Sequence, residues 1–460
     1  MLRLMPSVLV ISTYDLGRQP FGLASAAAAL RAAGAEVACA DLSRDRLTPE
    51  QVEAADVVGF FLPMHTATRL AVPVIARVRE LNPVARLCAF GLYAPLNAAW
   101  LREHGVDHIL GAEFEDDLQR LIAGAATSEL GSAIVPRVTF RIPARDGLPA
   151  LSRYATLRIG RETKVVGYTE ASRGCKHTCR HCPIVPVYDG RFRVVPIDLV
   201  LADVRAQVLA GARHITFGDP DFFNGIRHAM AVVHAVHAEF PDLSYDVTIK
   251  IEHLLNHAGR LGELTATGCA FVTSAVESVD GGILERLAKG HTPSDFERAV
   301  ELCRAAGLSL SPTFVAFTPW TTLAGYCTLL HTLDRLGLVE QVAPIQLAIR
   351  LLVTAGSRLL ELPDIGRLAP VFDPETMTYP WRHADPAVDR LHAHVALIAG
   401  ERGAESRRET FDEIWRAAHE AAGLTPPARA IAVASPGPIA YMSEPWYCCA
   451  EPTPAQEALI

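Results

Sequence analysis

The sequence lacks the features of a membrane, nucleic-acid-binding or exported protein. No apolar run reaches the roughly 18 residues that a bilayer-spanning helix needs. The net charge of −8 provides no basic surface, so we expect neither nucleic acid nor a membrane as the partner. The short apolar stretch near the N-terminus has no small-residue cleavage site after it and fits a buried first strand better than a signal peptide. These absences predict a cytoplasmic, folded protein.

A disulfide framework is also absent from the pattern of the ten cysteines. Five of them stand singly in apolar stretches, as small core residues do: Cys39, Cys88, Cys269, Cys303 and Cys327. The other five are grouped: Cys175, Cys179 and Cys182 in "SRGCKHTCRHCP", and Cys448 and Cys449 in "WYCCAEP". Grouped thiols in a reducing compartment indicate chemistry at both places.

The chain length of 460 residues indicates more than one domain. Short apolar strands alternate with helices over residues 1–130, which predicts a doubly wound, Rossmann-like parallel sheet. Residues 131–165 form a connector. About six further strand–helix units over 166–360 predict a partial (β/α)6 TIM barrel, whose chemistry lies at the C-terminal strand ends. Residues 361–460 are expected to form a helical, proline-rich extension that ends in the cysteine pair.

The cysteine triplet has the spacing Cys175-x3-Cys179-x2-Cys182. Zinc is one interpretation, with His177 or His181 as the fourth ligand, and it implies a zinc-stapled α/β binding or scaffold protein. A [4Fe–4S] cluster is the other, because three thiolates leave one iron open for a substrate or cofactor. The position of the triplet, in a loop that opens a large α/β domain, favours the cluster.

The triplet after a first barrel strand resembles the radical S-adenosylmethionine (SAM) superfamily. The resemblance implies that SAM chelates the open iron and is cleaved reductively, with a 5′-deoxyadenosyl radical as the usual product. It also implies an electron donor such as flavodoxin or ferredoxin. Cys175, Cys179 and Cys182 are then the cluster ligands.

Further motifs are similar to the superfamily in chain order. "GDPD" ends a strand where the family places partners of the SAM amine, which implies roles for Gly218, Asp219 and Asp221. "VES" ends a later strand, where Glu277 and Ser278 resemble residues that line the SAM ribose and methionine.

Two further positions near the expected cofactor are marked by the resemblance, one as a match and one as a departure. Arg350, in "IRLLVTAGSRL", is placed by the resemblance to meet a carboxylate. His181 stands where many family members have an aromatic residue that contacts adenine, and an imidazole can still stack there. Arg173 and Arg180 flank the triplet, and we expect solvated side chains for both.

The N-terminal domain resembles the cobalamin-binding domain of the B12-dependent radical SAM subgroup. The cobalt-ligating Asp-x-His-x-x-Gly is absent, and "TYDLGRQPFG" with Asp15 follows the first strand instead. Two alternatives therefore stay open: cobalamin binds without a protein histidine, or the domain holds something else.

The ending "CCAEP" resembles a radical SAM subgroup whose tails read Cys-Cys-Ala-Glu-Pro or Cys-selenocysteine-Ala-Glu-Pro. A reactive chalcogen at Cys449 is implied. Vicinal thiols bind thiophilic atoms such as arsenic or selenium, cycle through a disulfide, or donate a hydrogen atom; the bland alternative is an exposed, idle tail.

Together these patterns predict an enzyme that modifies a small molecule by radical chemistry, with Cys448 and Cys449 as a substrate-binding or redox element. The alternative within the class is transfer of a methyl or 3-amino-3-carboxypropyl group from SAM to a thiophilic atom. Cys448, Cys449 and the triplet thus mark the two candidate sites.

Overall fold

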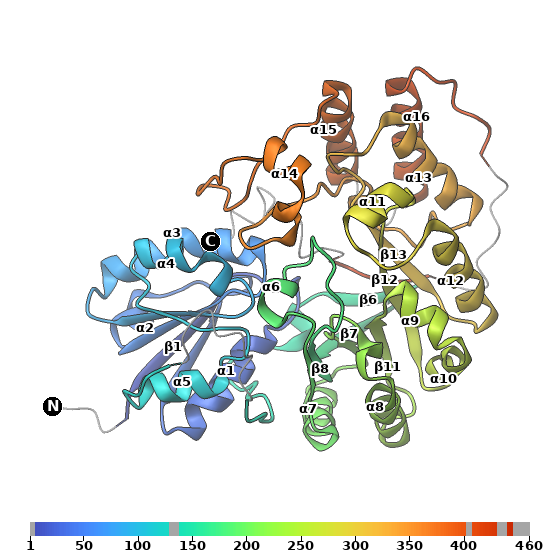
Figure 1. Ribbon diagram of the computed structural model, residues 1–460. Helices are drawn as coiled ribbons and strands as arrows, with labels where there is room; N and C mark the ends of the chain where they lie inside the picture. The colour runs from blue at the N-terminus through green and yellow to red at the C-terminus, as the bar shows by residue number, and fades with distance from the viewer. Residues whose placement is uncertain (1–4, 128–137, 402–406, 430–438, 445–460) are drawn as a thin grey trace.

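The computed structural model describes residues 5–127, 138–401, 407–429 and 439–444. Figure 1 shows the N-terminal sheet (blue) beside a second α/β layer (green to yellow), with C-terminal helices (orange and red) at the top. Cys448 and Cys449 lie outside the described residues. No helix in the described ranges is long and apolar enough to span a membrane.

The N-terminal part is a parallel sheet in the order β2-β1-β3-β4-β5 with helices on both faces. Its strands are β1 Ser7–Ser12, β2 Glu36–Asp41, β3 Val57–Phe61, β4 Arg86–Phe90 and β5 His108–Ile109. Its helices are α1 Phe21–Ala32, α2 Pro49–Glu53, α3 His65–Leu81, α4 Ala98–Glu103 and α5 Glu115–Ile122. Every residue of β3 is buried, as expected for a strand covered on both faces.

Local sequence signals set the ends of these elements. Thr48 caps α2 and forms a capping box with Gln51, and Pro49 occupies the first helical position. Gly34, just after α1, has φ of +84°, a conformation that glycine adopts without a steric penalty. The predicted doubly wound sheet is therefore confirmed.

The central part is a curled sheet in the order β13-β12-β11-β10-β7-β6-β14. Its strands are β6 Thr156–Ile159, β7 Glu162–Thr169, β10 His214–Phe217, β11 Ser244–Thr248, β12 Cys269–Glu277, β13 Leu310–Phe314 and β14 Ala440–Met442. The strands β7 and β10 to β13 run parallel, whereas β6 pairs antiparallel with β7 and with β14. A separate ribbon consists of β8 Ser172–Gly174 and β9 Phe192–Val194.

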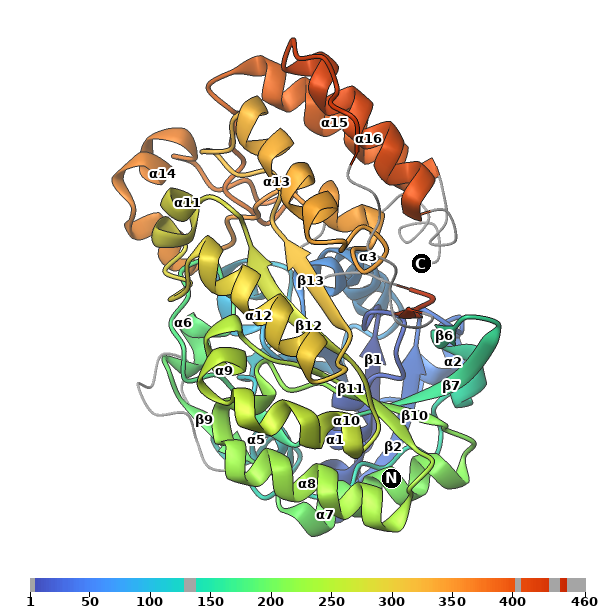
Figure 2. The same cartoon turned by 90° about the vertical axis from the view of Figure 1, so that its right-hand side faces the viewer.

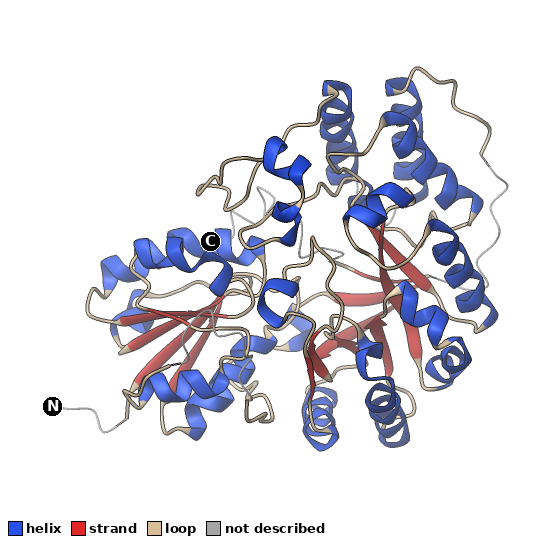
Figure 3. Cartoon of the chain, viewed as in Figure 1, coloured by secondary structure: helices blue, strands red, loops and turns tan. Residues whose placement is uncertain are grey.

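Helices cover the outer face of this sheet (Figure 2). They are α7 Ile197–Leu209, α8 Ile226–Glu239, α9 Ile251–Asn256, α10 Leu261–Ala266, α12 Pro293–Ala305 and α13 Leu323–Arg335. The short helix α6 Val185–Tyr188 follows the cysteine loop and lies between the two sheets, and α11 Gly281–Arg286 follows the end of β12 (Figure 1). The C-terminal helices are α14 Pro363–Leu368, α15 Pro386–Glu401 and α16 Arg407–Ala421. Figure 3 shows that helices surround both sheets.

The half-barrel differs from the predicted six units at its last strand. Residues 344–347 form a 3-10 turn, and the strand that should follow is reduced to a parallel bridge between Phe317 and Arg350. The sequence also gave no sign that the chain returns near its end as β14 to extend the sheet beyond β6.

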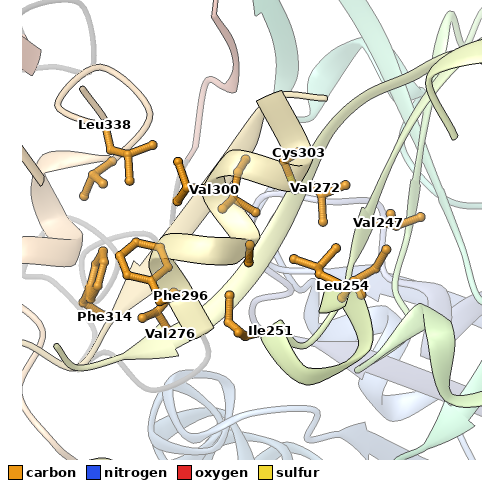
Figure 4. Close-up of a cluster of buried hydrophobic side chains, with 14 of the residues drawn as sticks. Val247, Ile251, Leu254, Val272, Val276, Phe296, Val300, Cys303, Phe314 and Leu338 are labelled. Atoms are coloured by element: carbon orange, nitrogen blue, oxygen red, sulfur yellow. The ribbon is translucent and has the colours of Figure 1, made fainter. Parts of the chain in front are cut away.

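A continuous apolar core joins the barrel strands to their helices. Figure 4 shows part of it, where Phe296, Val300 and Cys303 of α12 pack near Val272 of β12 and Phe314 of β13. Four of the five cysteines predicted to be core residues are buried, namely Cys88, Cys269, Cys303 and Cys327, and Cys39 is half-buried. These thiols contribute packing.

Buried charges join the two parts of the molecule. Arg173 beside the triplet lies 2.7 Å from Glu115 of α5 and 2.7 Å from Glu170. Its side chain is 8% exposed, so the expectation of a solvated Arg173 is wrong. Arg145 of the connector donates hydrogen bonds of 2.7 Å to Gln19 Oε1 of the N-terminal part and to Asp203 Oδ1 of α7. Because each charge is paired, the two sheets are held in one orientation.

Candidate functional site

A cavity of about 500 Å³ lies between the two sheets. Loops that follow β1, β3 and β4 form one wall, with Asp15, Pro63 and Tyr93 among the lining residues. The cysteine loop and the C-terminal ends of the barrel strands form the other wall. Parallel α/β sheets bind ligands at these strand ends, and here two such edges share one space.

All three cysteines of the triplet line this cavity. The loop leaves β8 at Gly174, whose φ is +75° and where a Cβ atom would lie only 2.5 Å from the Tyr188 ring. Burial raises the pKa of the Cys175 thiol, so in the absence of a metal that thiol is neutral. A metal centre would supply the charge that three thiolates need, and the three thiols fit three ligands of a [4Fe–4S] cluster.

A buried charged group adjoins the triplet. Glu277 ends β12 with φ of +68°, and its Oε1 lies 3.1 Å from His181 Nε2 and 3.3 Å from Lys289 Nζ. Burial favours the neutral acid, but the Lys289 ammonium and the His181 imidazole outweigh it and lower the pKa of Glu277 to about 2. The structure therefore brings together the predicted His181 and Glu277, and adds a buried cation beside Cys179 and Cys182.

All four residues of "GDPD" also line the cavity. Gly218 and Asp219 contact neighbouring parts of the protein. A Cβ atom on Gly218 would collide with the Tyr168 hydroxyl. The Asp219 carboxylate accepts hydrogen bonds from Ala171 N at 2.9 Å and Ser172 Oγ at 2.5 Å, which fixes the start of the cysteine loop. Burial raises the pKa of Asp219 to about 7 despite these bonds.

Asp221, the last residue of this motif, is 1% exposed. Its Oδ1 accepts from Phe223 N and Lys250 N, at 3.3 and 3.4 Å. Its Oδ2 faces the imidazoles of His177 and His253. The carboxylate thus has protein partners on both oxygens.

Ser278 and Arg350 lie outside the set of cavity-lining residues. The Ser278 hydroxyl accepts a hydrogen bond from Asp280 N at the start of α11. Arg350 Nη1 lies 2.8 Å from Asp389 of α15, and its guanidinium stacks 3.8 Å from the centre of the Trp381 ring. The missing sixth strand explains this, because Arg350 projects toward the C-terminal helices.

Sequence reasoning missed several residues of the cavity wall. Lys289 stands in an ordinary helix-to-loop segment, and its role depends on burial beside Glu277. Tyr441, Met442 and Glu444 line the cavity because β14 pairs with β6, which no local signal indicated. The Glu444 carboxylate accepts from Tyr14 Oη at 3.1 Å and contacts Arg44 Nη2 at 3.3 Å.

The cavity wall of the N-terminal sheet carries no imidazole among its described residues. His65 is buried at the start of α3, where Nε2 bonds Thr376 O at 2.8 Å. Asp15 is the acidic group at the end of β1, and burial raises its pKa to about 7. Any ligand of this wall would therefore meet aromatic rings, backbone, a carboxyl group and the Arg18 guanidinium.

Together these features define the class of the protein: a half-barrel presents a thiol triplet to a cavity roofed by a Rossmann-like sheet. Residues 169–321 match the model of the Radical SAM superfamily, so the chain contains a radical SAM domain. Proteins with this domain are enzymes that use a [4Fe–4S] cluster and SAM, which confirms the predicted class and these two cofactors. The match favours the iron–sulfur interpretation over the zinc-stapled scaffold.

Curated relatives resemble part of the chain. The tRNA-2-methylthio-N(6)-dimethylallyladenosine synthase of Chlorobium phaeobacteroides is 27% identical over 212 residues, which covers 42% of this chain and 46% of that protein. The ribosomal protein uS12 methylthiotransferase RimO of Geobacter sulfurreducens is 22% identical over 243 residues, or 45% of this chain and 52% of that one. The chain therefore spans about half the length of these relatives.

Solved structures resemble more of the chain. The cobalamin-dependent SAM radical enzyme OxsB, with aqua-cobalamin bound, superposes with a TM-score of 0.65 at 14% identity over 85% of this chain and 66% of that one. The radical SAM methyltransferase TsrM of Kitasatospora setae, with cobalamin and a [4Fe–4S] cluster bound, gives 0.55 at 19% identity over 72% and 70%. At such identities the likeness concerns the fold, and it covers both sheets.

Proposed function

We propose that this protein is a radical SAM enzyme that modifies a small molecule in the cavity between its two sheets. The observation that carries the proposal is that three thiols and a buried cation line one cavity between two walls of the protein. When bound, a [4Fe–4S] cluster on Cys175, Cys179 and Cys182 supplies the electron for reductive cleavage of SAM.

The protein's own residues have separate tasks in this proposal. Lys289 places a positive charge beside the thiolates and lowers the cost of burying them. His181, held by Glu277, offers an imidazole face to a nucleoside. Gly218 leaves room for the Tyr168 hydroxyl against the strand end, and Asp219 fixes the loop through Ala171 and Ser172. Ser278 is proposed to act through the turn that begins α11.

The cysteine pair is proposed to act in the same cavity. Glu444 is anchored at the cavity wall by Tyr14 and Arg44. Cys448 follows four residues later, and four residues of chain span at most about 14 Å. This short connection supports a role for Cys448 and Cys449 in binding the substrate or in exchanging electrons with it.

Group transfer is the second candidate, and the comparisons favour it for a specific reason. One relative is named a methylthiotransferase and the other a 2-methylthio-adenosine synthase, and one structural neighbour is titled a methyltransferase. Transfer of a methyl or 3-amino-3-carboxypropyl group to arsenic or selenium held by the cysteine pair would combine both observations. The tRNA and ribosomal-protein substrates in the relatives' names are less suited to a chain with net charge −8.

Cobalamin is proposed as a ligand of the N-terminal wall. The support is the fold shared with cobalamin-bound structures and a cavity at the C-terminal edge of this sheet. No histidine lines the described part of that wall, so the protein would hold cobalamin without an imidazole on cobalt. Anaerobic binding of hydroxocobalamin, followed by its visible spectrum, tests this directly.

One experiment distinguishes the candidates. The anaerobically reconstituted protein is reduced with SAM by dithionite or by flavodoxin, and the SAM fragments are identified by mass spectrometry. 5′-Deoxyadenosine supports radical modification, methylthioadenosine supports 3-amino-3-carboxypropyl transfer, and S-adenosylhomocysteine supports methyl transfer. Protein that holds zinc and no iron after anaerobic purification would refute the proposal.

A further inference from the structure

A second group of ligand-type side chains lies beside the cysteine loop. His177 lies between Cys175 and Cys179, Asp221 follows β10, and His253 belongs to α9. One nitrogen from each imidazole and one Asp221 oxygen lie within 4.8 Å of one another. Two imidazoles and one carboxylate on three separate elements form the ligand set of many catalytic metal sites.

The spacing of these atoms suits one small cation. His177 Nε2 lies 3.4 Å from Asp221 Oδ2 and 3.3 Å from His253 Nε2. Ligands about 2.0–2.1 Å from a tetrahedral zinc ion are separated by roughly 3.3 Å. The two imidazole nitrogens face each other at hydrogen-bond distance, and when both are unprotonated each can donate its lone pair to one shared cation.

Burial gives an independent reason to expect a cation. Asp221 and His253 are 1% and 2% exposed. The Asp221 Oδ2 atom makes no hydrogen bond of acceptable geometry within the described part of the chain, and its contact at 2.7 Å is an ion-pair contact with the other imidazole nitrogen of His253, Nδ1. Buried polar atoms without such partners are costly, and a bound metal ion removes that cost.

The surroundings of His177 match those of a metal ligand. Its second nitrogen, Nδ1, lies 3.7 Å from Glu252 Oε2, and Lys250 Nζ holds the same carboxylate oxygen at 3.3 Å. The 3.7 Å separation exceeds hydrogen-bond distance, so Glu252 contributes a negative charge near the His177 ring, which favours a cation on the ring's other nitrogen. The Asp221 Oδ1 atom is meanwhile fixed by Phe223 N and Lys250 N, so Oδ2 is aimed at the imidazoles.

The site opens toward the cavity already described. His177 and Asp221 both line the cavity, while His253 lies behind them. Three protein ligands on one side leave a coordination position on the other, which is the arrangement of catalytic metal sites rather than closed structural ones.

We propose that His177, Asp221 and His253 bind one divalent transition-metal ion of the zinc type, with its open position directed into the cavity. The bound ion would accept an oxygen, nitrogen or sulfur atom of the cavity ligand and orient it beside the cysteine loop. This assigns Asp221 to the metal instead of the SAM amine. The site needs none of the triplet thiols and does not depend on the radical SAM activity.

The test removes every competing thiol ligand and then measures metal binding. Tag-free, full-length protein with Cys175, Cys179, Cys182, Cys448 and Cys449 replaced by serine is freed of metal with a chelator and titrated with Co²⁺. We expect one equivalent to bind, with visible d–d bands of a four- or five-coordinate nitrogen–oxygen site and no thiolate charge-transfer band. Zn²⁺ should displace the Co²⁺.

Matched variants in the same background locate the site. His253→Gln and Asp221→Asn should each abolish the bands, and Asp221→Asn keeps an oxygen for the backbone bonds if the first variant unfolds. Glu252→Gln should weaken Co²⁺ binding by about 10- to 100-fold. His257→Gln alters a neighbouring imidazole outside the ligand set and should leave the affinity unchanged.

Two outcomes would overturn the proposal: no Co²⁺ binding by the folded background protein, or binding that persists unchanged in both His253→Gln and Asp221→Asn. Circular dichroism establishes folding in each case. Because the cluster ligands are already absent, failure here leaves the iron content and SAM cleavage of the native protein as separate tests of the radical SAM function.

Discussion

Two buried carboxyl groups line the same cavity from opposite walls and behave in opposite ways. Asp15, at the end of β1, has its pKa raised to about 7 by burial, which the nearby Arg18 only partly offsets. Glu277, at the end of β12, has its pKa lowered to about 2, because Lys289 and His181 outweigh the same burial effect. Burial raises the pKa of both carboxyl groups, and the neighbouring positive charges determine whether the folded protein keeps the group ionised.

The contrast extends to the two walls. The barrel wall carries thiols, imidazoles and paired charges, which are the kinds of side chain that bind metal ions and SAM. The described part of the N-terminal wall carries aromatic rings, the Arg18 guanidinium and a carboxyl group whose pKa burial raises to about 7. The thiols and most of the imidazoles and paired charges of the cavity therefore lie on the barrel wall.

The largest expected effect tests whether the barrel wall alone holds the iron. Replacing Cys175, Cys179 and Cys182 with alanine should reduce the iron content from about four per chain to near zero and abolish SAM cleavage. Iron analysis and visible absorption measure this. The matched control is Cys39→Ala, a half-buried thiol of β2, which should keep full iron content. Equal iron loss in the control would contradict the assignment.

The next effect breaks the charge pairing on the barrel wall. Lys289→Met leaves Glu277 without its main cationic partner, and we expect a loss of about 3–5 kcal/mol in the free energy of unfolding. Urea-induced unfolding at pH 7 measures it. The double variant Lys289→Met with Glu277→Gln should recover most of this loss. If the double variant is as unstable as Lys289→Met alone, the two groups are not coupled.

The third prediction uses pH to separate the two walls. The folded pKa of Asp15 is above its usual value of 3.8, so its contribution to stability is complete below about pH 4 and is lost as pH rises through 7. Asp15→Asn should therefore flatten the stability profile between pH 4 and 8. Each pKa unit corresponds to about 1.4 kcal/mol.

Glu277 has the opposite sign. Its folded pKa is below the usual 4.5, so its contribution is present above pH 4.5 and is lost as pH falls toward 2. Glu277→Gln should flatten only this acid limb. Thermal unfolding across the pH range compares both variants with the native protein, and identical slopes in all three proteins would remove the contrast between the walls.

The smallest effect concerns the link between the walls and the cysteine pair. Glu444→Ala removes one hydrogen bond and one partly exposed ion pair, which should cost about 1 kcal/mol in stability. If the cysteine pair acts in the cavity, turnover should fall more than stability does. Glu420→Ala, an exposed acidic residue of α16, is the control. A turnover rate equal to that of the control would show that this anchor is dispensable.

Features encoded in short segments could be predicted from the sequence. The spacing of Cys175, Cys179 and Cys182 predicts the cluster-binding loop because the three thiols are close in the chain, and the structure places all three at the cavity. The capping box at Thr48 and the apolar runs of β1 and β3 likewise depend on neighbouring residues. Glu277 and His181 were recognised by motif, although their mutual contact was not.

Features that depend on partners distant in the chain could not be predicted. The sequence predicts an exposed Arg173, whereas in the fold this side chain is buried between Glu115 and Glu170. The sequence predicts that Arg350 contacts the cofactor. In the fold the sixth strand is only a bridge at Arg350, and the side chain pairs with Asp389. The sequence marks His177 only as a histidine of the cysteine loop. The fold places Asp221 and His253, from other elements, next to it.

The sequence by itself therefore determined the class of chemistry, because cluster ligands, strand patterns and caps are local in the chain. Only the tertiary structure decided which buried groups stay ionised and which walls of the cavity face each other. Burial and electrostatic pairing act through space, and residues 76 apart, such as His177 and His253, interact there as neighbours.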